Sequence, residues 1–324
     1  MKDSSENLKA KALELKAHLG DSFVFDFNKD EILETLNKEI DLSDDEPSNI
    51  IKTFRTNIES IISTSQLPIY MSFERTIKLM YDEIYLKENI LSIKYKFSKT
   101  EDEKGKKLEE ELNKRTKEKA NEEFNDKIQS TEGSREFWFH SLIFLRQCSE
   151  NGLISDQFLT SSKELINQVT LLTWSSLEIL LRDIFVYTLN TFPNKTEVLF
   201  NDSNLKSKFG IKSIPTEKLI EYNFNLNGKM GDILIENFDF SNIDLIRSIY
   251  DCLFNDKNLN EKLKDNEIWK LYNRRNLIVH RGSIVDSKYL SKTDDCFQIG
   301  EKMFIKPYEL KVYIQKTIDI ALEL

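Results

Sequence analysis

Three side chains near residue 275 have the types and spacing that phosphate chemistry requires. They are Arg275, Asn276 and His280. Arginine carries a fixed positive charge that grips a phosphate, whereas histidine takes up or releases a proton near neutral pH. Asparagine both donates and accepts hydrogen bonds. Together they supply the groups for attack of a hydroxyl on a phosphodiester, and that scheme requires no metal ion.

The sequence around these residues is basic, although the whole chain of 324 residues has a net charge of -9. Between residues 261 and 292 eight basic residues accompany four acidic ones, Glu261, Asp265, Glu267 and Asp286. The basic residues are Lys262, Lys264, Lys270, Arg274, Arg275, Arg281, Lys288 and Lys292. A local basic patch on an acidic chain is a plausible docking surface for a phosphate backbone. Arg274 and Arg281 are the additional candidates for RNA contact.

A helix over residues 258–281 must position this set. On such a helix the apolar residues fall on one stripe, formed by Ile268, Leu271, Tyr272, Ile278 and Val279. Arg275 points out of the middle of that stripe, where a guanidinium needs a carboxylate, a polar cleft or a partner subunit. One candidate carboxylate is Glu178, so a buried ion pair between Arg275 and Glu178 is an alternative to catalysis that is also compatible with it.

Composition indicates an all-α fold. The chain has only 9 Gly and 5 Pro, and it is rich in residues that favour helices. We expect an N-terminal helical region over residues 1–98 and a charged helix or linker over residues 99–134. Residues 135–324 form the third expected part, with a long central helix from about residue 155 to residue 190.

Two stretches resemble the HEPN superfamily of bacterial helical proteins. Arg275 to His280 reads R-N-L-I-V-H, which matches the family's R-x4-H pattern and its preference for a polar residue directly after the arginine. Residues 281–290 read R-G-S-I-V-D-S-K-Y-L, which resembles the continuation in many bacterial HEPN-like proteins, where a glycine and an I-V-D-x-x-Y-L run follow the histidine. Residues 174–185 are similar to the family's long second helix. The resemblance covers roughly residues 135–324.

The resemblance implies a HEPN-like helical bundle that dimerises so that two R-x4-H helices face one shared cleft. Many relatives are metal-independent endoribonucleases that leave a cyclic phosphate and serve as toxins or anti-phage effectors. By position His280 would be the general acid or base, Arg275 the phosphate clamp and Asn276 an orienting partner. The implied partners are an RNA substrate, a second copy of the chain and an antitoxin or regulatory protein.

A different class of function remains open, namely a non-catalytic scaffold that dimerises or binds RNA while residues 1–134 sense or recruit. An antitoxin-like or nucleotide-modified regulator is a third possibility. We expect no metal site and no cofactor, since His18 and His140 lack partners at ligand spacing and Cys148, Cys252 and Cys296 lie far apart. No membrane anchor or secretory signal is visible, so the expected location is the cytoplasm.

Overall fold

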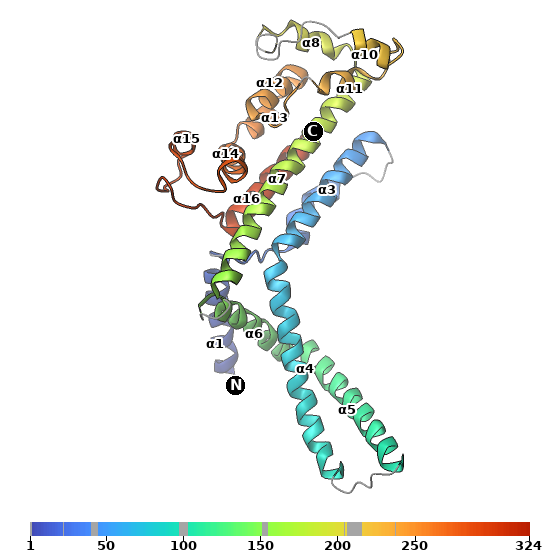
Figure 1. Ribbon diagram of the computed structural model, residues 1–324, viewed down its shortest axis with the longest axis vertical. Helices are drawn as coiled ribbons and strands as arrows, with labels where there is room; N and C mark the ends of the chain where they lie inside the picture. Colours follow the sequence, from blue (N-terminus) through green and yellow to red (C-terminus); the bar gives the residue numbers. More distant parts are fainter. Residues whose placement is uncertain are drawn as a thin grey trace. The chain divides into compact units, whose positions relative to one another are not determined.

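The computed structural model has an all-α fold (Figure 1). It describes residues 2–21, 23–39, 45–96, 103–150, 155–203, 205, 216–236 and 238–324. Over these ranges no sheet forms, and the only strand-like pairing is a single antiparallel bridge between Ile284 and Lys302. The expected boundary between residues 98 and 99 lies outside the described residues.

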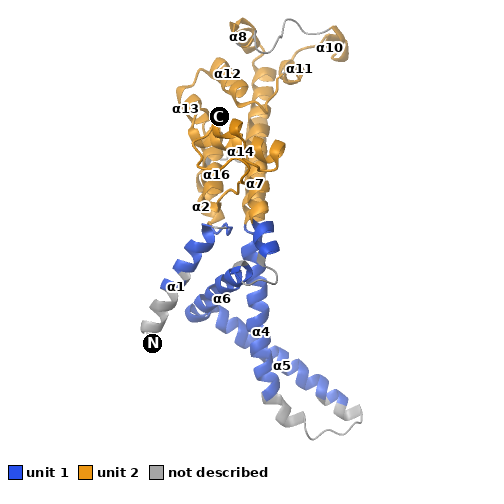
Figure 2. Ribbon diagram, turned by 60° about the vertical axis from the view of Figure 1, so that its left-hand side comes forward, with its two compact units in different colours: residues 1–26, 66–162 blue, residues 27–65, 163–324 orange. Residues whose placement is uncertain are grey.

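The described chain divides into two compact units, each drawn in its own colour in Figure 2. Unit 1 contains residues 1–26 and 66–162, and unit 2 contains residues 27–65 and 163–324. This division differs from the contiguous parts expected from the sequence. Helix α6 (Thr131–Glu150) belongs to unit 1 although its residues from 135 onward were expected in the third part, and unit 2 includes residues 27–65.

Unit 1 is built from α1 (Lys2–Gly20), α4 (Leu67–Lys96), α5 (Glu103–Gln129) and α6. Its core joins α1 and its following turn to α4 and α6 through Leu15, Leu19, Phe23, Val24, Ile69, Leu142 and Leu145. The charged segment is a helix, α5, which packs along α4 (Figure 1). Ala120 is fully buried there, and Lys87 of α4 lies 2.7 Å from Glu123. One narrow buried stripe is therefore enough to attach a helix that is otherwise polar.

Unit 2 contains most of the long helix α7 (Ser155–Thr191), together with two helices from early in the chain and eight from its C-terminal half. The early pair is α2 (Lys29–Glu39) and α3 (Glu46–Ser65). The later helices are α8 (Lys195–Asn201), α10 (Thr216–Glu221), α11 (Met230–Ile235), α12 (Ile243–Phe254), α13 (Lys257–Leu263), α14 (Asn266–Arg281), α15 (Ser287–Leu290) and α16 (Pro307–Ala321). Its largest fully buried side chains include Trp174, Phe185, Tyr250 and Tyr313, whose burial contributes hydrophobic stabilisation.

Side-chain caps set the starts of four helices in unit 2. Asn242, Asp256, Asp265 and Asp286 each accept hydrogen bonds from backbone amides in the first turn of the following helix. Asp265 divides the helix expected over residues 258–281 into α13 and α14. The start of α14 is thus fixed three turns before the candidate site.

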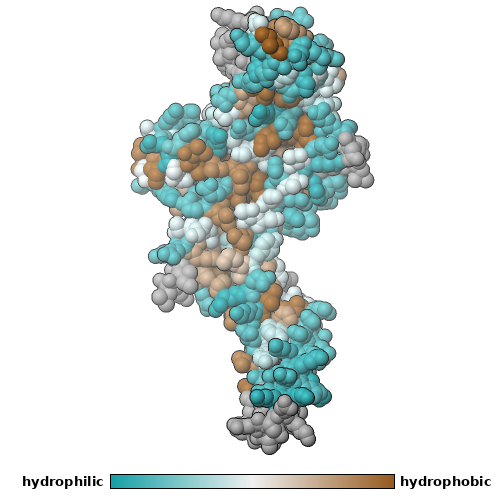
Figure 3. Space-filling view, turned by 45° about the vertical axis from the view of Figure 1, so that its right-hand side comes forward, coloured by the Kyte–Doolittle hydropathy of each residue, from teal (hydrophilic) through white to brown (hydrophobic). Residues whose placement is uncertain are grey.

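Apolar side chains are not confined to the interior. Figure 3 shows apolar patches scattered among hydrophilic side chains on one face. In unit 2 the exposed apolar residues include Leu172 and Ile179 of α7, which are 50% and 44% exposed, and Val279 of α14, which is 52% exposed. None of the described helices combines the length and the apolar character that crossing a membrane requires.

Candidate functional site

Helix α14 turns its inner face to the core and its outer face to a pocket. Ile268, Leu271 and Ile278 are buried, as the apolar stripe predicts, whereas Val279 is 52% exposed. The apolar stripe expected from the sequence is therefore only partly buried. The buried face instead runs through positions 271, 274 and 278, which are spaced by three and four residues. Arg275 and Asn276 consequently lie beside the core, on the side of the helix that faces the pocket.

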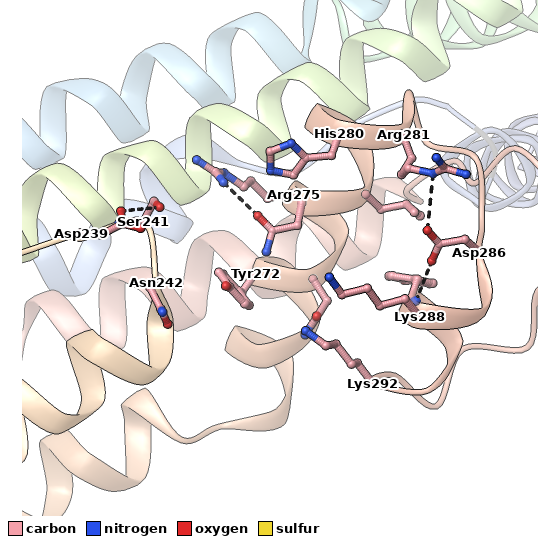
Figure 4. Close-up of a pocket in the computed structure, with 14 residues that line it drawn as sticks. Asp239, Ser241, Asn242, Tyr272, Arg275, His280, Arg281, Asp286, Lys288 and Lys292 are labelled. Carbon is pink, nitrogen blue, oxygen red and sulfur yellow. Dashed lines mark hydrogen bonds and ion pairs between the residues drawn. The ribbon is translucent and has the colours of Figure 1, made fainter. Parts of the chain in front are cut away.

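The pocket has a volume of about 400 Å³ and lies entirely in unit 2 (Figure 4). The predicted residues Arg275, Asn276, His280 and Arg281 all line it. Three groups of residues make up most of the wall. They are Tyr272, Arg275, Asn276, His280 and Arg281 on α14, Asp286, Lys288 and Lys292 beyond it, and Asp239, Ser241 and Asn242 before α12. Four lining side chains are cationic and two are anionic, so the pocket is positive within an acidic chain.

Arg275 is held by neighbours on both sides. Its Nη1 donates a 2.9 Å hydrogen bond to Oδ1 of Asn276, and its Nη2 lies 3.9 Å from Oε2 of Glu178. The same carboxylate oxygen accepts a 3.0 Å hydrogen bond from Nε1 of Trp174, which is buried on α7. The side chain of Arg275 is 20% exposed. Glu178 therefore orients Arg275 at the pocket edge and leaves part of its guanidinium accessible.

His280 lies in the last turn of α14 and is exposed. Gly282 ends the helix in the left-handed conformation, with φ of 58°, and its N–H donates to the carbonyl of Ile278. No other side chain in the described ranges forms a hydrogen bond or ion pair with His280. Its imidazole is thus open to hydrogen bonding with a molecule in the pocket.

Arg281 and Asp286 form an ion pair at one side of the pocket, with Nε 3.4 Å from Oδ2. The other oxygen of Asp286 accepts a 2.8 Å hydrogen bond from the backbone N–H of Tyr289. Figure 4 shows the ion pair of Asp286 with Arg281 as a dashed line. The guanidinium of Arg281 remains more than half exposed, at 57%, so the ion pair does not remove it from the pocket.

Arg274 is the candidate for RNA contact that the structure contradicts. It is 3% exposed, and its guanidinium hydrogen-bonds to Asp295, Glu309 and Tyr289 at 2.7–3.3 Å. Burial opposes its charge, but Tyr313, Glu309, Tyr289 and Asp295 outweigh burial and raise the pKa of Arg274 above its ordinary value. Arg274 therefore links the segment that follows α14, through Asp295, to α16, through Glu309.

Asn167 of α7 is a supporting residue that sequence reasoning missed. It is fully buried and accepts a 3.1 Å hydrogen bond from the backbone N–H of Ile305. Its amide nitrogen lies 3.3 Å from Oγ of Ser283 and 3.4 Å from the carbonyl of Met303. It thus holds both ends of the loop that carries Asp286, Lys288 and Lys292. The available signal was a polar residue on the apolar face of a long helix.

No group of three or more His, Cys, Asp or Glu side chains in the described ranges is arranged to hold a metal ion. Cys148 and Cys252 are partly buried free thiols, and burial raises the pKa of each. Cys296 is free and exposed. The polar side chains that line the pocket carry guanidinium, ammonium, carboxylate, amide, hydroxyl and imidazole groups.

Comparison with known proteins finds no relative. No family model matches the chain, and no curated protein or solved structure matches it. The resemblance of residues 135–324 to the HEPN superfamily stays a prediction, which rests on the motifs around Arg275 and Trp174.

Proposed function

We propose that this protein is a metal-independent endoribonuclease of the toxin or anti-phage type, which acts in the cytoplasm as a homodimer. The observation that carries the proposal is the pocket itself. Arg275, Asn276 and His280 line one positive cavity, and the R-x4-H resemblance gives the same three residues catalytic roles. The exposed His280 and the partly exposed Arg275 provide a proton carrier and a phosphate clamp side by side.

In the proposed reaction an RNA 2′-hydroxyl attacks the adjacent phosphorus. His280 takes the proton from the 2′-oxygen as the new O–P bond forms. The bond from phosphorus to the 5′-oxygen of the next nucleotide then breaks, and that oxygen receives a proton. The products are a 2′,3′-cyclic phosphate and a free 5′-hydroxyl. Arg275 stabilises the negative charge that develops on the non-bridging phosphate oxygens.

The two proton transfers support a dimeric enzyme. One group must accept the proton of the attacking oxygen while another donates to the leaving oxygen, and the pocket of a single chain contains one histidine. A second copy would supply the second histidine across a two-fold axis. Val279, which neighbours His280, is an exposed apolar residue suited to such an interface. An antitoxin-like partner would keep the enzyme silent by covering the same surface.

The test is cleavage of RNA by the purified full-length protein in EDTA. We expect cyclic-phosphate products, and we expect Arg275→Ala and His280→Ala each to lower the rate by about 10²–10⁴-fold. Arg146→Ala and His140→Ala remove exposed residues of the same types from unit 1 and should cleave like the wild type. Equal cleavage by all five proteins would mean a contaminating nuclease and would reject the proposal.

One observation favours the alternative of a non-catalytic scaffold. Arg275 contacts Glu178 and Asn276, and such contacts suit an arginine that only stabilises the packing of α14 against α7. On that alternative, Arg275→Ala would lower the thermal midpoint, and neither the wild type nor the variant would cleave RNA. Measuring both properties on the same preparations separates the two functions.

A further inference from the structure

Two lysines line the pocket, but the proposed cleavage reaction does not use them. Lys288 and Lys292 belong to the short segment after α14, and both are exposed. Neither ammonium group has an ion-pair partner among the residues that the structure describes. We propose that they bind a second phosphate, next to the one held by Arg275, so that the enzyme prefers an oligonucleotide with consecutive phosphates. The inference rests on the proposed nuclease function and deepens it.

The segment that carries the lysines is firmly held. The carbonyl of Lys292 accepts a 2.7 Å hydrogen bond from Nε1 of Trp269 on α14. Between the lysines, Tyr289 is buried and hydrogen-bonds to Asp295 and Arg274. The backbone of both lysines is therefore fixed before any ligand arrives. Such preorganisation lowers the entropy cost of binding.

Neither anionic residue in the pocket neutralises the two lysines. Asp286 is engaged by Arg281 and by the backbone N–H of Tyr289. Asp239 accepts hydrogen bonds from the backbone N–H and the hydroxyl of Ser241, at 3.0 and 2.6 Å. The two ammonium groups thus contribute an unbalanced positive charge, which a phosphate dianion or diester can satisfy.

The two cationic groups come from different parts of the pocket wall. Figure 4 shows Arg275 and His280 on α14, and Lys288 and Lys292 on the segment that follows it. The volume of about 400 Å³ lies within the range of pockets that accept nucleotide-sized ligands. A single inorganic phosphate would leave one group unused, whereas consecutive phosphates of one strand engage both.

The test compares two substrates, a ribonucleoside dimer with its single internal phosphate and the same dimer with an additional terminal phosphate. We expect the wild type to prefer the phosphorylated dimer by about tenfold or more in kcat/KM, since hydrogen bonds to charged groups are strong. The double variant Lys288→Ala/Lys292→Ala should lose that preference and still cleave the plain dimer. Lys257→Ala/Lys264→Ala removes the same charge from exposed positions outside the pocket and should keep it.

Binding provides an independent measurement that does not require cleavage. In a His280→Ala background, affinity for a short RNA should fall with salt, and removing the two pocket lysines should reduce the slope of log K against log salt by about 0.7. An unchanged slope and affinity would reject the second phosphate site even if the enzyme cleaves RNA. If the wild type binds RNA through these lysines but never cleaves it, the second phosphate site is supported and the nuclease function is rejected.

Discussion

Arg274 and Arg275 follow one another on α14, but their surroundings differ because consecutive helical residues are about 100° apart. Arg274 is directed into the core, where two carboxylates receive it. Arg275 reaches the pocket edge. The same residue type thus serves stability at one position and, as we propose, chemistry at the next.

Replacing Arg274 with alanine should destabilise the fold strongly. The change would leave Asp295 and Glu309, whose side chains are 9% and 19% exposed, without their cation, a loss of up to about 3–5 kcal/mol. Urea denaturation followed by circular dichroism measures the free energy of unfolding. Arg281→Ala, at an exposed arginine seven residues later, should stay within about 0.5 kcal/mol of the wild type. Equal losses in the free energy of unfolding would show that the hydrogen-bonded network of Arg274 stabilises the fold no more than the exposed Arg281 does.

Because of Asp183 on α7, we expect the stability of the fold to depend on pH. Burial raises the pKa of its carboxyl above 3.8, although Arg182 opposes the shift. A raised carboxyl pKa means that ionisation costs more in the folded state, so stability is lost as pH rises through that pKa. We expect Asp183→Asn to melt at a higher temperature than the wild type at pH 7, and the gap to close below pH 3.8. A gap that grows in acid would contradict this.

At the residue level, sequence reasoning brought together side chains that share one helix face. Helical spacing was sufficient to group Arg275, Asn276 and His280 because no tertiary information is needed for neighbours on a helix. It failed for Arg274, although Leu271 and Ile278 at three and four residues already indicated an inward position. Lys288 and Lys292 lay within the basic stretch, but their place in the pocket depends on hydrogen bonds across the fold, which spacing does not encode.

Between elements, α7 and α11 approach closely at Gly231. A Cβ added there would lie 2.2 Å from the backbone oxygen of Val186, which has no flexible end to move away. We expect Gly231→Ala to cost about 1–3 kcal/mol through forced separation of the two helices. Thermal unfolding provides the measurement. Gly20→Ala, at the end of α1 with nothing within 4 Å, serves as the matched control and should be neutral or slightly stabilising.

Helix existence was easier to predict than helix limits. Apolar periodicity predicted α7 nearly to its ends, because that helix is long and carries a continuous apolar face. The single helix expected over 258–281 is instead two helices, and the second begins after Asp265. The carboxylate of Asp265 caps α14 by accepting a hydrogen bond from the N–H of Glu267. An aspartate inside an apolar pattern is compatible with both a cap and a solvated helix position, so local sequence alone did not decide.

On the scale of the whole chain, composition indicated a boundary near residue 134 because charge falls and apolar content rises there. The compact units follow contacts instead, and residues 27–65 join residues 163–324. Such long-range pairing has no counterpart in local composition. The charged α5 therefore looked like a separator, whereas it packs within unit 1 against α4 and α6.

The proposed dimer leads to a prediction about size. Val279→Lys should place a charge in the apolar interface and shift the protein from dimer to monomer, as measured by light scattering after gel filtration. Val198→Lys makes the same change at a residue of α8 that is 48% exposed and should leave the dimer intact. A wild-type protein that is monomeric at micromolar concentration would contradict the shared cleft.

Unit 2 is built from two separate stretches of the chain, and this affects how the protein folds during translation. Helices α2 and α3 leave the ribosome before all of residues 66–162, and the rest of their unit follows only afterwards. During that interval their apolar faces, which include Phe54, Ile58 and Ile62, lack their final partners. A nascent chain of this protein is thus a natural client for chaperones that shield apolar surface until translation reaches α7 and beyond.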